Sequence, residues 1–348
     1  MDYTEGDIET EALPGQRTTQ EGISKIFYFF ERYTTLSSGR TIGRKIGVVQ
    51  EIVVRSYLLQ YGRLADAVIF EPQLPGYSGA THKVEFVFCQ PIKVVEFGLG
   101  CSSPIGSCQF TLLSIDTEKM RATFSVTNGE REQKATLIPF QVLDSAKGNK
   151  GKGVLSFGAT VKISTLTDDR VRLVVLDRAD VRASVESKRV GAQRFSGSDK
   201  LGAGIQTIEK AKQASLVAID ADLLFNGQLK VLSVPGATRR YISVVVLGNG
   251  VHWTEKDLSV LKTYVDFTFL IPDDSIIRYA EHVLQLATEA GHPFIDFFQS
   301  YFEGMTKAVP DGFTVGEGDF QVLRPETETR TLSDILDSQL DTYPIVEA

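Results

Sequence analysis

The sequence has little cysteine, histidine and tryptophan, with three, four and one among 348 residues. The histidines are scattered, and neither an HExxH motif nor paired His and Cys spacing occurs, so we do not expect a zinc site. The cysteines are odd in number and lack CxxC spacing, which favours reduced thiols over a disulfide between Cys101 and Cys108. The GxxxxGK[ST], GxGxxG and GxSxG motifs of nucleotide-binding proteins and hydrolases are missing too.

The chain also lacks a run of about 18 uncharged apolar residues, the length that a membrane-spanning helix needs. Its first eleven residues carry five acids, where a signal peptide would carry positive charge. We therefore expect a cytoplasmic protein without a membrane segment. With 42% apolar and 23% charged residues, the chain has enough apolar side chains for one large or two ordinary domains.

Charge is unevenly distributed along the chain. The net charge is −7, yet residues 147–240 hold 17 basic and 9 acidic residues, a balance of +8, which leaves −15 for the rest. A local positive surface can bind a polyanion, because phosphate neutralisation depends on the charges at the interface. Chance clustering on a solvated face is the alternative interpretation.

The segment TDDRVRLVVLDRADVRASVESKRVG carries acids and a lysine on two adjoining strand patterns. Asp168 and Asp169 precede the first strand, the polar run 177–180 predicts a turn, and Glu186 and Lys188 lie on the second strand. Residues two apart on a strand share a face, so Glu186 and Lys188 should project together. A hairpin would bring Asp168 or Asp169 beside Glu186. Such a group can hold Mg²⁺ and activate a water for phosphodiester hydrolysis.

This arrangement resembles the PD-(D/E)XK nuclease superfamily, whose pattern is an acid at the start of one strand and an acid-x-Lys triplet on the next. The matching positions are Asp168 or Asp169, then Glu186 and Lys188. A threonine stands where the family has a proline, which leaves the choice between the two aspartates open. Another triplet, at 132–134, follows an Asn-Gly turn in a polar run, whereas Glu186 lies between strand patterns in the basic region.

The resemblance implies a Mg²⁺-dependent, sequence-specific endonuclease of double-stranded DNA, of the type II restriction class, acting as a homodimer. It assigns Asp168, Asp169 and Glu186 to the metal, and Asp169, Glu186 and Lys188 to catalysis. Glu51 joins the catalytic set because many members place a glutamate on the helix before the core; a solvated helix face is its alternative role. The expected DNA-binding residues are basic: Arg170, Arg172, Arg182, Arg189, Arg194, Lys200 and Lys210.

The fold class we predict is α/β (α+β), with a mixed central sheet flanked by helices and a β-rich insertion or subdomain. Helical patterns cover 41–62, 200–214, 273–291 and 293–305, and Asn128-Gly129 is typical of a hairpin turn. The expected organisation is an acidic flexible N-terminus (1–20), a helix plus β-rich region with possible DNA recognition (21–143), the catalytic core (144–250), a helical region (251–318) and a loosely packed acidic tail (319–348). A non-catalytic nucleic-acid-binding or structural assembly protein is the alternative function.

Overall fold

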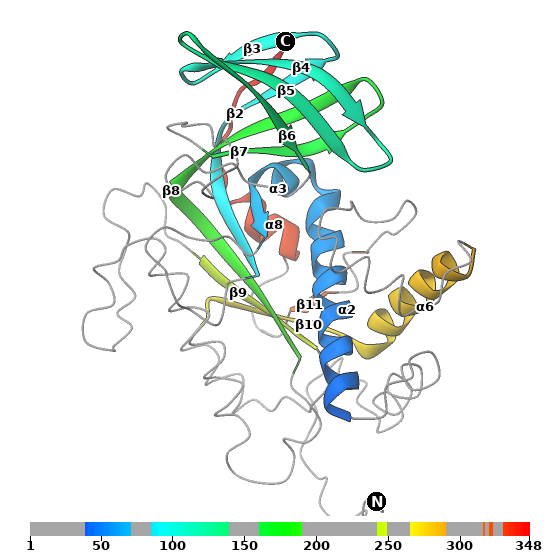
Figure 1. Cartoon of the computed structure of the whole chain (residues 1–348). Coiled ribbons are helices and arrows are strands. Elements are labelled where there is room, and N and C mark those ends of the chain that lie inside the picture. The colour runs from blue at the N-terminus through cyan, green and yellow to red at the C-terminus, as the bar shows by residue number, and fades with distance from the viewer. Residues whose placement is uncertain are drawn as a thin grey trace, which may run out of the picture.

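The computed structural model describes residues 39–70, 85–138, 160–189, 242–248, 265–289, 316, 320–322 and 330–348. These residues form a mixed sheet of eight strands, a separate antiparallel sheet of four strands, and helices that pack on the larger sheet (Figure 1). The predicted α/β class with a mixed central sheet is confirmed. Within these ranges, no helix has both the length and the apolar character needed to cross a membrane.

Two of the predicted helices are confirmed. The helix over 41–62 is α2, and the helix over 273–291 is α6; those over 200–214 and 293–305 lie outside the described residues. Apolar side chains at helical spacing explain α2, since Val49, Val53 and Tyr57 are all buried against the sheet. The described helices are α2 (Gly39–Gln60), α3 (Gly62–Ala67), α6 (Asp273–Glu289) and α8 (Leu332–Asp337).

The larger sheet has the strand order β1-β2-β8-β9-β10-β11, with β7 pairing β8 and β12 pairing β2; the smaller has the order β3-β4-β5-β6. Strands β8, β9 and β10 are mutually parallel, and β2 is antiparallel to β8. The strands are β1 (Val68–Phe70), β2 (Phe86–Gly98), β3 (Ser102–Ile105), β4 (Cys108–Asp116), β5 (Arg121–Asn128), β6 (Arg131–Leu137), β7 (Thr160–Leu166), β8 (Arg170–Arg189), β9 (Ile242–Gly248), β10 (Phe267–Ile271), β11 (Gln321–Val322) and β12 (Ile345–Glu347).

Strands β2 and β8 run through two regions with separate apolar cores (Figure 1). In the α/β region, residues 181–189 of β8 pair with the start of β2 and with β9, beneath helix α2. In the β-sandwich, the sheet β3–β6 packs against β7 and the other halves of β2 and β8. The two long strands therefore connect the two regions directly.

The turn predicted over 177–180 does not form a hairpin, and this prediction was wrong. Strand β8 is one strand of 20 residues, and the polar run is an irregularity in it. Gln90 of β2 pairs with Asp177 and Cys89 pairs with Val181, so residues 178–180 have no partner on β2. Because β2 continues alongside both halves of β8, the extra residues bend the strand instead of reversing it.

Residues 331–340 pack into the core of the α/β region, so the prediction of a loosely packed tail is wrong for this part of the C-terminal segment. Leu332, Ile335, Leu336 and Leu340 are buried in the core of the α/β region, at helical spacing. After α8 the chain pairs β12 in parallel with β2. The acidic composition of this segment concealed its apolar face.

Candidate active site

Two buried glutamates meet where β2 begins and β8 ends. Phe86 of β2 pairs with Val185 of β8, so Glu85 and Glu186 follow as the next opposed positions. The backbone N–H of Glu85 donates to Oε2 of Glu186 at 3.2 Å, and the N–H of Ser187 donates to Oε2 of Glu85 at 2.6 Å. The two residues are 9% and 7% exposed. Each carboxylate therefore accepts a hydrogen bond from the backbone of the opposite strand or its flank.

Strand alternation determines the face on which the pair lies. Phe86 and Val185 pack in the core under α2, together with Phe88 and Ala183. Glu85 and Glu186 occupy the alternate positions and therefore lie on the face of the sheet away from α2. Position 188 is two residues beyond Glu186 and pairs with Leu247 of β9, so the backbone places it on the same face of β8.

Helix α2 contacts this end of the sheet through Gln50. Its side chain is fully buried, and its amide nitrogen donates to Oγ of Ser187 at 3.0 Å and to the backbone oxygen of Val246 at 3.1 Å. Glu51, the residue predicted to assist catalysis, is the next residue of α2 and is partly exposed. The helix prediction was correct, and Gln50, the neighbour of the predicted residue, hydrogen-bonds to β8.

The paired carboxylates are suited to a hard divalent cation. Magnesium commonly takes one or two protein carboxylates and retains several waters, so Glu85 and Glu186 suffice as its protein ligands. Across the described ranges, no group of three or more His, Cys, Asp or Glu residues is placed to hold a metal ion. Among the described residues, the candidate ligand set is therefore this pair.

Asp168 and Asp169 lie far from Glu186, so the prediction that a hairpin brings them together is wrong. Both are exposed in the turn between β7 and β8, where Thr167 and Arg170 exchange hydrogen bonds. Glu186 lies near the opposite end of β8 (Figure 1). The aspartates belong to the β-sandwich because β8 continues through its bend without reversing.

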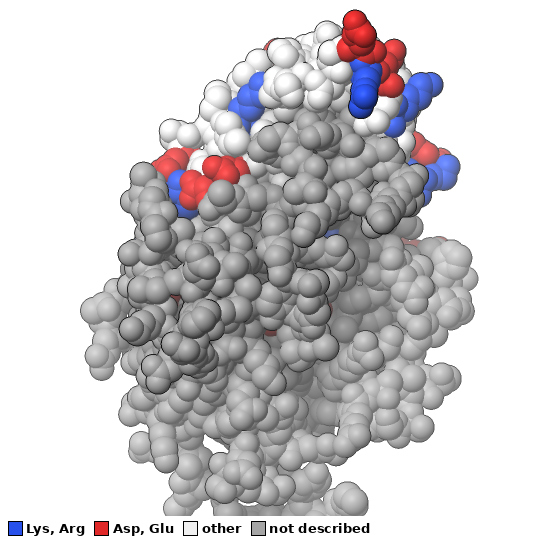
Figure 2. Space-filling view, turned by 60° about the vertical axis from the view of Figure 1, so that its left-hand side comes forward, with Lys and Arg blue, Asp and Glu red and all other residues white. Residues whose placement is uncertain are grey.

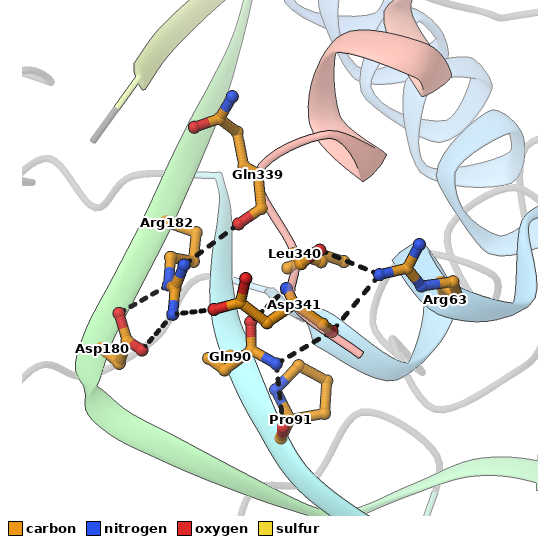
Figure 3. Close-up of polar contacts among 8 residues, drawn as sticks. All are labelled: Arg63, Gln90, Pro91, Asp180, Arg182, Gln339, Leu340 and Asp341. Carbon is orange, nitrogen blue, oxygen red and sulfur yellow. Dashed lines mark hydrogen bonds and ion pairs between the residues drawn. The ribbon is translucent and has the colours of Figure 1, made fainter. Parts of the chain in front are cut away.

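Arg182, one of the predicted DNA-binding residues, is a buried structural side chain. It lies just after the bend in β8 and is 3% exposed (Figure 3). Its guanidinium contacts Asp180 at 2.5 Å and Asp341 at 2.9 Å, and it donates to the backbone oxygen of Gln339. This ion-pair network fastens the C-terminal segment to β8, so phosphate binding by Arg182 does not fit its placement.

The other predicted DNA-binding residues fall into two groups. Arg170 pairs with Glu96 at 3.1 Å and with Glu347 at 3.4 Å, and Arg172 pairs with Asp66 at 3.0 Å. Both arginines are therefore ion-paired with acids of the same chain. In the view of Figure 2, most basic side chains on the described surface likewise lie next to acidic ones. Of the remainder, Arg189 ends β8, whereas Arg194, Lys200 and Lys210 lie outside the described residues.

Sequence reasoning missed Glu85. It lies in the middle of the segment HKVEFVF, and only the structure shows that it directly precedes the first residue of β2, Phe86. It lies 101 positions before Glu186, and the β-sandwich strands intervene. The sequence pattern instead indicated Asp168 or Asp169, on the strand nearest along the chain, as the first acid.

Comparisons of the chain with protein-family models, with curated proteins and with solved structures find no match. The function proposed below is therefore inferred from the geometry of the site and from the sequence pattern around it.

Proposed function

We propose that this protein is a Mg²⁺-dependent nuclease of the PD-(D/E)XK type, in which Glu85 and Glu186 hold the metal and Lys188 acts on the attacking water. The observation that supports this most strongly is the crossed pair of hydrogen bonds that joins Glu85 to the Glu186-Ser187 backbone. The acid-x-Lys triplet of the original prediction is retained, and Glu85 replaces Asp168 or Asp169 as the first acid.

The order of the elements around the pair also supports the proposal. In the PD-(D/E)XK superfamily, which the sequence resembles, the elements follow the order helix, strands, helix, strand. The chain supplies α2, then β1, β2 and β8, and then β9, which is parallel to β8. A parallel connection requires a crossover, and the sequence predicts a helix over 200–214 between the two strands, outside the described residues.

Each side chain has a definite chemical task in this proposal. Bound Mg²⁺ supplies polarisation of the phosphate and a water of lowered pKa. Glu85 and Glu186 provide the anionic oxygens that bind the cation. An ammonium group at Lys188 would orient the water or help to remove its proton, and general acid–base assistance of this kind contributes about 10²- to 10⁴-fold in rate.

Double-stranded DNA is the proposed substrate, and a homodimer that cuts both strands at a symmetric sequence is the proposed assembly. The basic balance of residues 147–240 favours a polyanion. Because Arg170, Arg172 and Arg182 pair with acids of the same chain, we assign the phosphate contacts to Arg189, Arg194, Lys200 and Lys210.

Cleavage of supercoiled plasmid and phage DNA with Mg²⁺ tests the proposal, with EDTA as the metal-free control. We expect discrete fragments, and we expect the Glu85→Gln, Glu186→Gln and Lys188→Ala variants to lose about 100-fold or more in rate. Asp168→Asn and Asp169→Asn are matched controls that should cut at the wild-type rate.

Two results would contradict parts of the proposal. Loss of cleavage in Asp169→Asn, with cleavage retained in Glu85→Gln, would return the first-acid role to the aspartates. A wild-type protein that binds DNA in a salt-sensitive manner and cuts none would instead be the non-catalytic nucleic-acid-binding protein.

A further inference from the structure

Ser187, the middle residue of the acid-x-Lys triplet, connects the carboxylate pair to helix α2. Its backbone N–H donates to Oε2 of Glu85, and its Oγ accepts a hydrogen bond from Nε2 of Gln50. The N–H of Glu85 in turn donates to Glu186. A continuous series of hydrogen bonds thus runs from Gln50 through Ser187 to both acids.

The orientation of the Gln50 amide follows from its second partner. The backbone oxygen of Val246 only accepts hydrogen bonds, so the amide nitrogen must face it. This leaves Oε1 of Gln50 buried without a hydrogen-bond partner in the part of the chain that the structure describes. An apolar residue would avoid that cost, because an unpaired buried acceptor destabilises the folded state.

A residue that is costly for stability and linked to the site is a candidate for a functional role. We propose that Gln50 is a positioning residue, which sets the separation of Glu85 and Glu186 by joining Ser187 of β8 to Val246 of β9. This inference rests on the proposed function, since the separation of the two acids matters most when they share a metal ion. Outer-shell partners of metal ligands act in this way in other metalloproteins.

Titration of the full-length protein with Mg²⁺ tests the inference. Gln50→Leu removes both hydrogen bonds at similar volume, and we expect its Mg²⁺ affinity to fall about 10-fold or more, with a matching increase in the Mg²⁺ concentration needed for cleavage. Val53→Ala is the matched control, because it alters a buried residue of the same helix that has no contact with Ser187 among the contacts described. The control should keep its Mg²⁺ affinity although it loses stability.

The amide proton of Ser187 provides a second measurement that requires neither metal nor cleavage. In the metal-free wild type, its short hydrogen bond to a carboxylate should give a strongly downfield proton resonance, visible after selective serine labelling. Gln50→Leu should move this resonance upfield, and Val53→Ala should leave it in place. Gln50→Glu retains the length of the side chain but places a second oxygen near the Val246 carbonyl. We expect it to move the Ser187 resonance upfield, as Gln50→Leu does.

The two measurements separate failure of this inference from failure of the proposed function. Unchanged Mg²⁺ affinity and an unmoved Ser187 resonance in Gln50→Leu would overturn the positioning role. A wild-type protein that binds no Mg²⁺ would overturn the proposed function, and the Ser187 resonance would still decide whether Gln50 positions the two carboxylates.

Discussion

The α/β region and the β-sandwich share strands β2 and β8 but bury different kinds of side chain. The core of the β-sandwich is apolar and aromatic, with Phe97, Phe110 and Phe124 in edge-to-face contact. The cross-strand pair Thr123 and Thr136 lies on its outer face. The α/β region instead buries glutamine, serine and two glutamates at one end of its sheet.

This difference bears on the function we propose. Burying a carboxylate is costly unless hydrogen bonds or a cation compensate it, and Glu85 and Glu186 each accept a backbone hydrogen bond. The β-sandwich has an ordinary hydrophobic core. In the nuclease we propose, the buried polar end of the α/β region would carry the reactive groups and the β-sandwich would give structural support.

Removing an aromatic ring from the β-sandwich should have the largest effect on stability. Phe124 is fully buried, and its ring centroid lies 5.8 Å from that of Phe97 and 6.0 Å from that of Phe110. We expect Phe124→Ala to lower the free energy of unfolding by about 3 to 5 kcal/mol, from lost burial and the cavity left behind. Urea unfolding followed by circular dichroism measures this.

The same experiment tests whether the shared strands couple the two regions. Because β2 and β8 belong to both cores, Phe124→Ala should still unfold in one transition, at a lower urea concentration. Two separate transitions would show that the α/β region is stable without the β-sandwich. Thr123→Ala, on the outer face of the same strand, is the control and should change stability by roughly 0.5 kcal/mol or less.

The boundary between the regions should show a pH dependence of intermediate size. Lys162 of β7 is buried, and its ammonium donates to the backbone oxygens of Ala65 and Val68 at the end of α3. Burial lowers the pKa of Lys162 to about 7, although Asp66 and Cys89 partly oppose this. Between pH 7 and the ordinary lysine pKa, the unfolded chain binds more protons than the folded protein, so stability should rise with pH.

Comparison with a Lys162→Met variant isolates this contribution. The difference in unfolding free energy between wild type and variant should shift in favour of the wild type by about 2 kcal/mol from pH 7 to pH 9. Urea unfolding at several pH values measures it. Parallel curves for the two proteins across this range would exclude a titrating Lys162.

The smallest effect is expected at the helix that fastens the C-terminal segment to the α/β region. Thr331 caps α8: its hydroxyl accepts from the N–H of Asp334, whose carboxylate accepts from the N–H of Thr331. Thr331→Ala should cost about 1 kcal/mol in unfolding free energy, and Thr331→Ser, which keeps the hydroxyl, should cost less. Equal losses in the two variants would contradict a capping role.

Local patterns predicted much of the fold. The Asn-Gly signal correctly predicted the turn between β5 and β6, where Gly129 adopts a φ of 61° that favours glycine. Apolar spacing correctly predicted α2 and α6. The polar run 177–180 misled the prediction, because a bulge and a turn have similar composition and only the presence of β2 alongside distinguishes them.

By itself, the sequence determined the mixed fold class, the two helices and the placement of Glu186 and Lys188 two apart on one strand, because these depend on residues close together in the chain. Only the tertiary structure decided which acid stands beside Glu186. Strand pairing brings together residues 101 positions apart, and no local pattern specifies such a partner. For the same reason, only the fold showed that Gln50 on α2 reaches Ser187 and that Arg182 binds acids of its own chain.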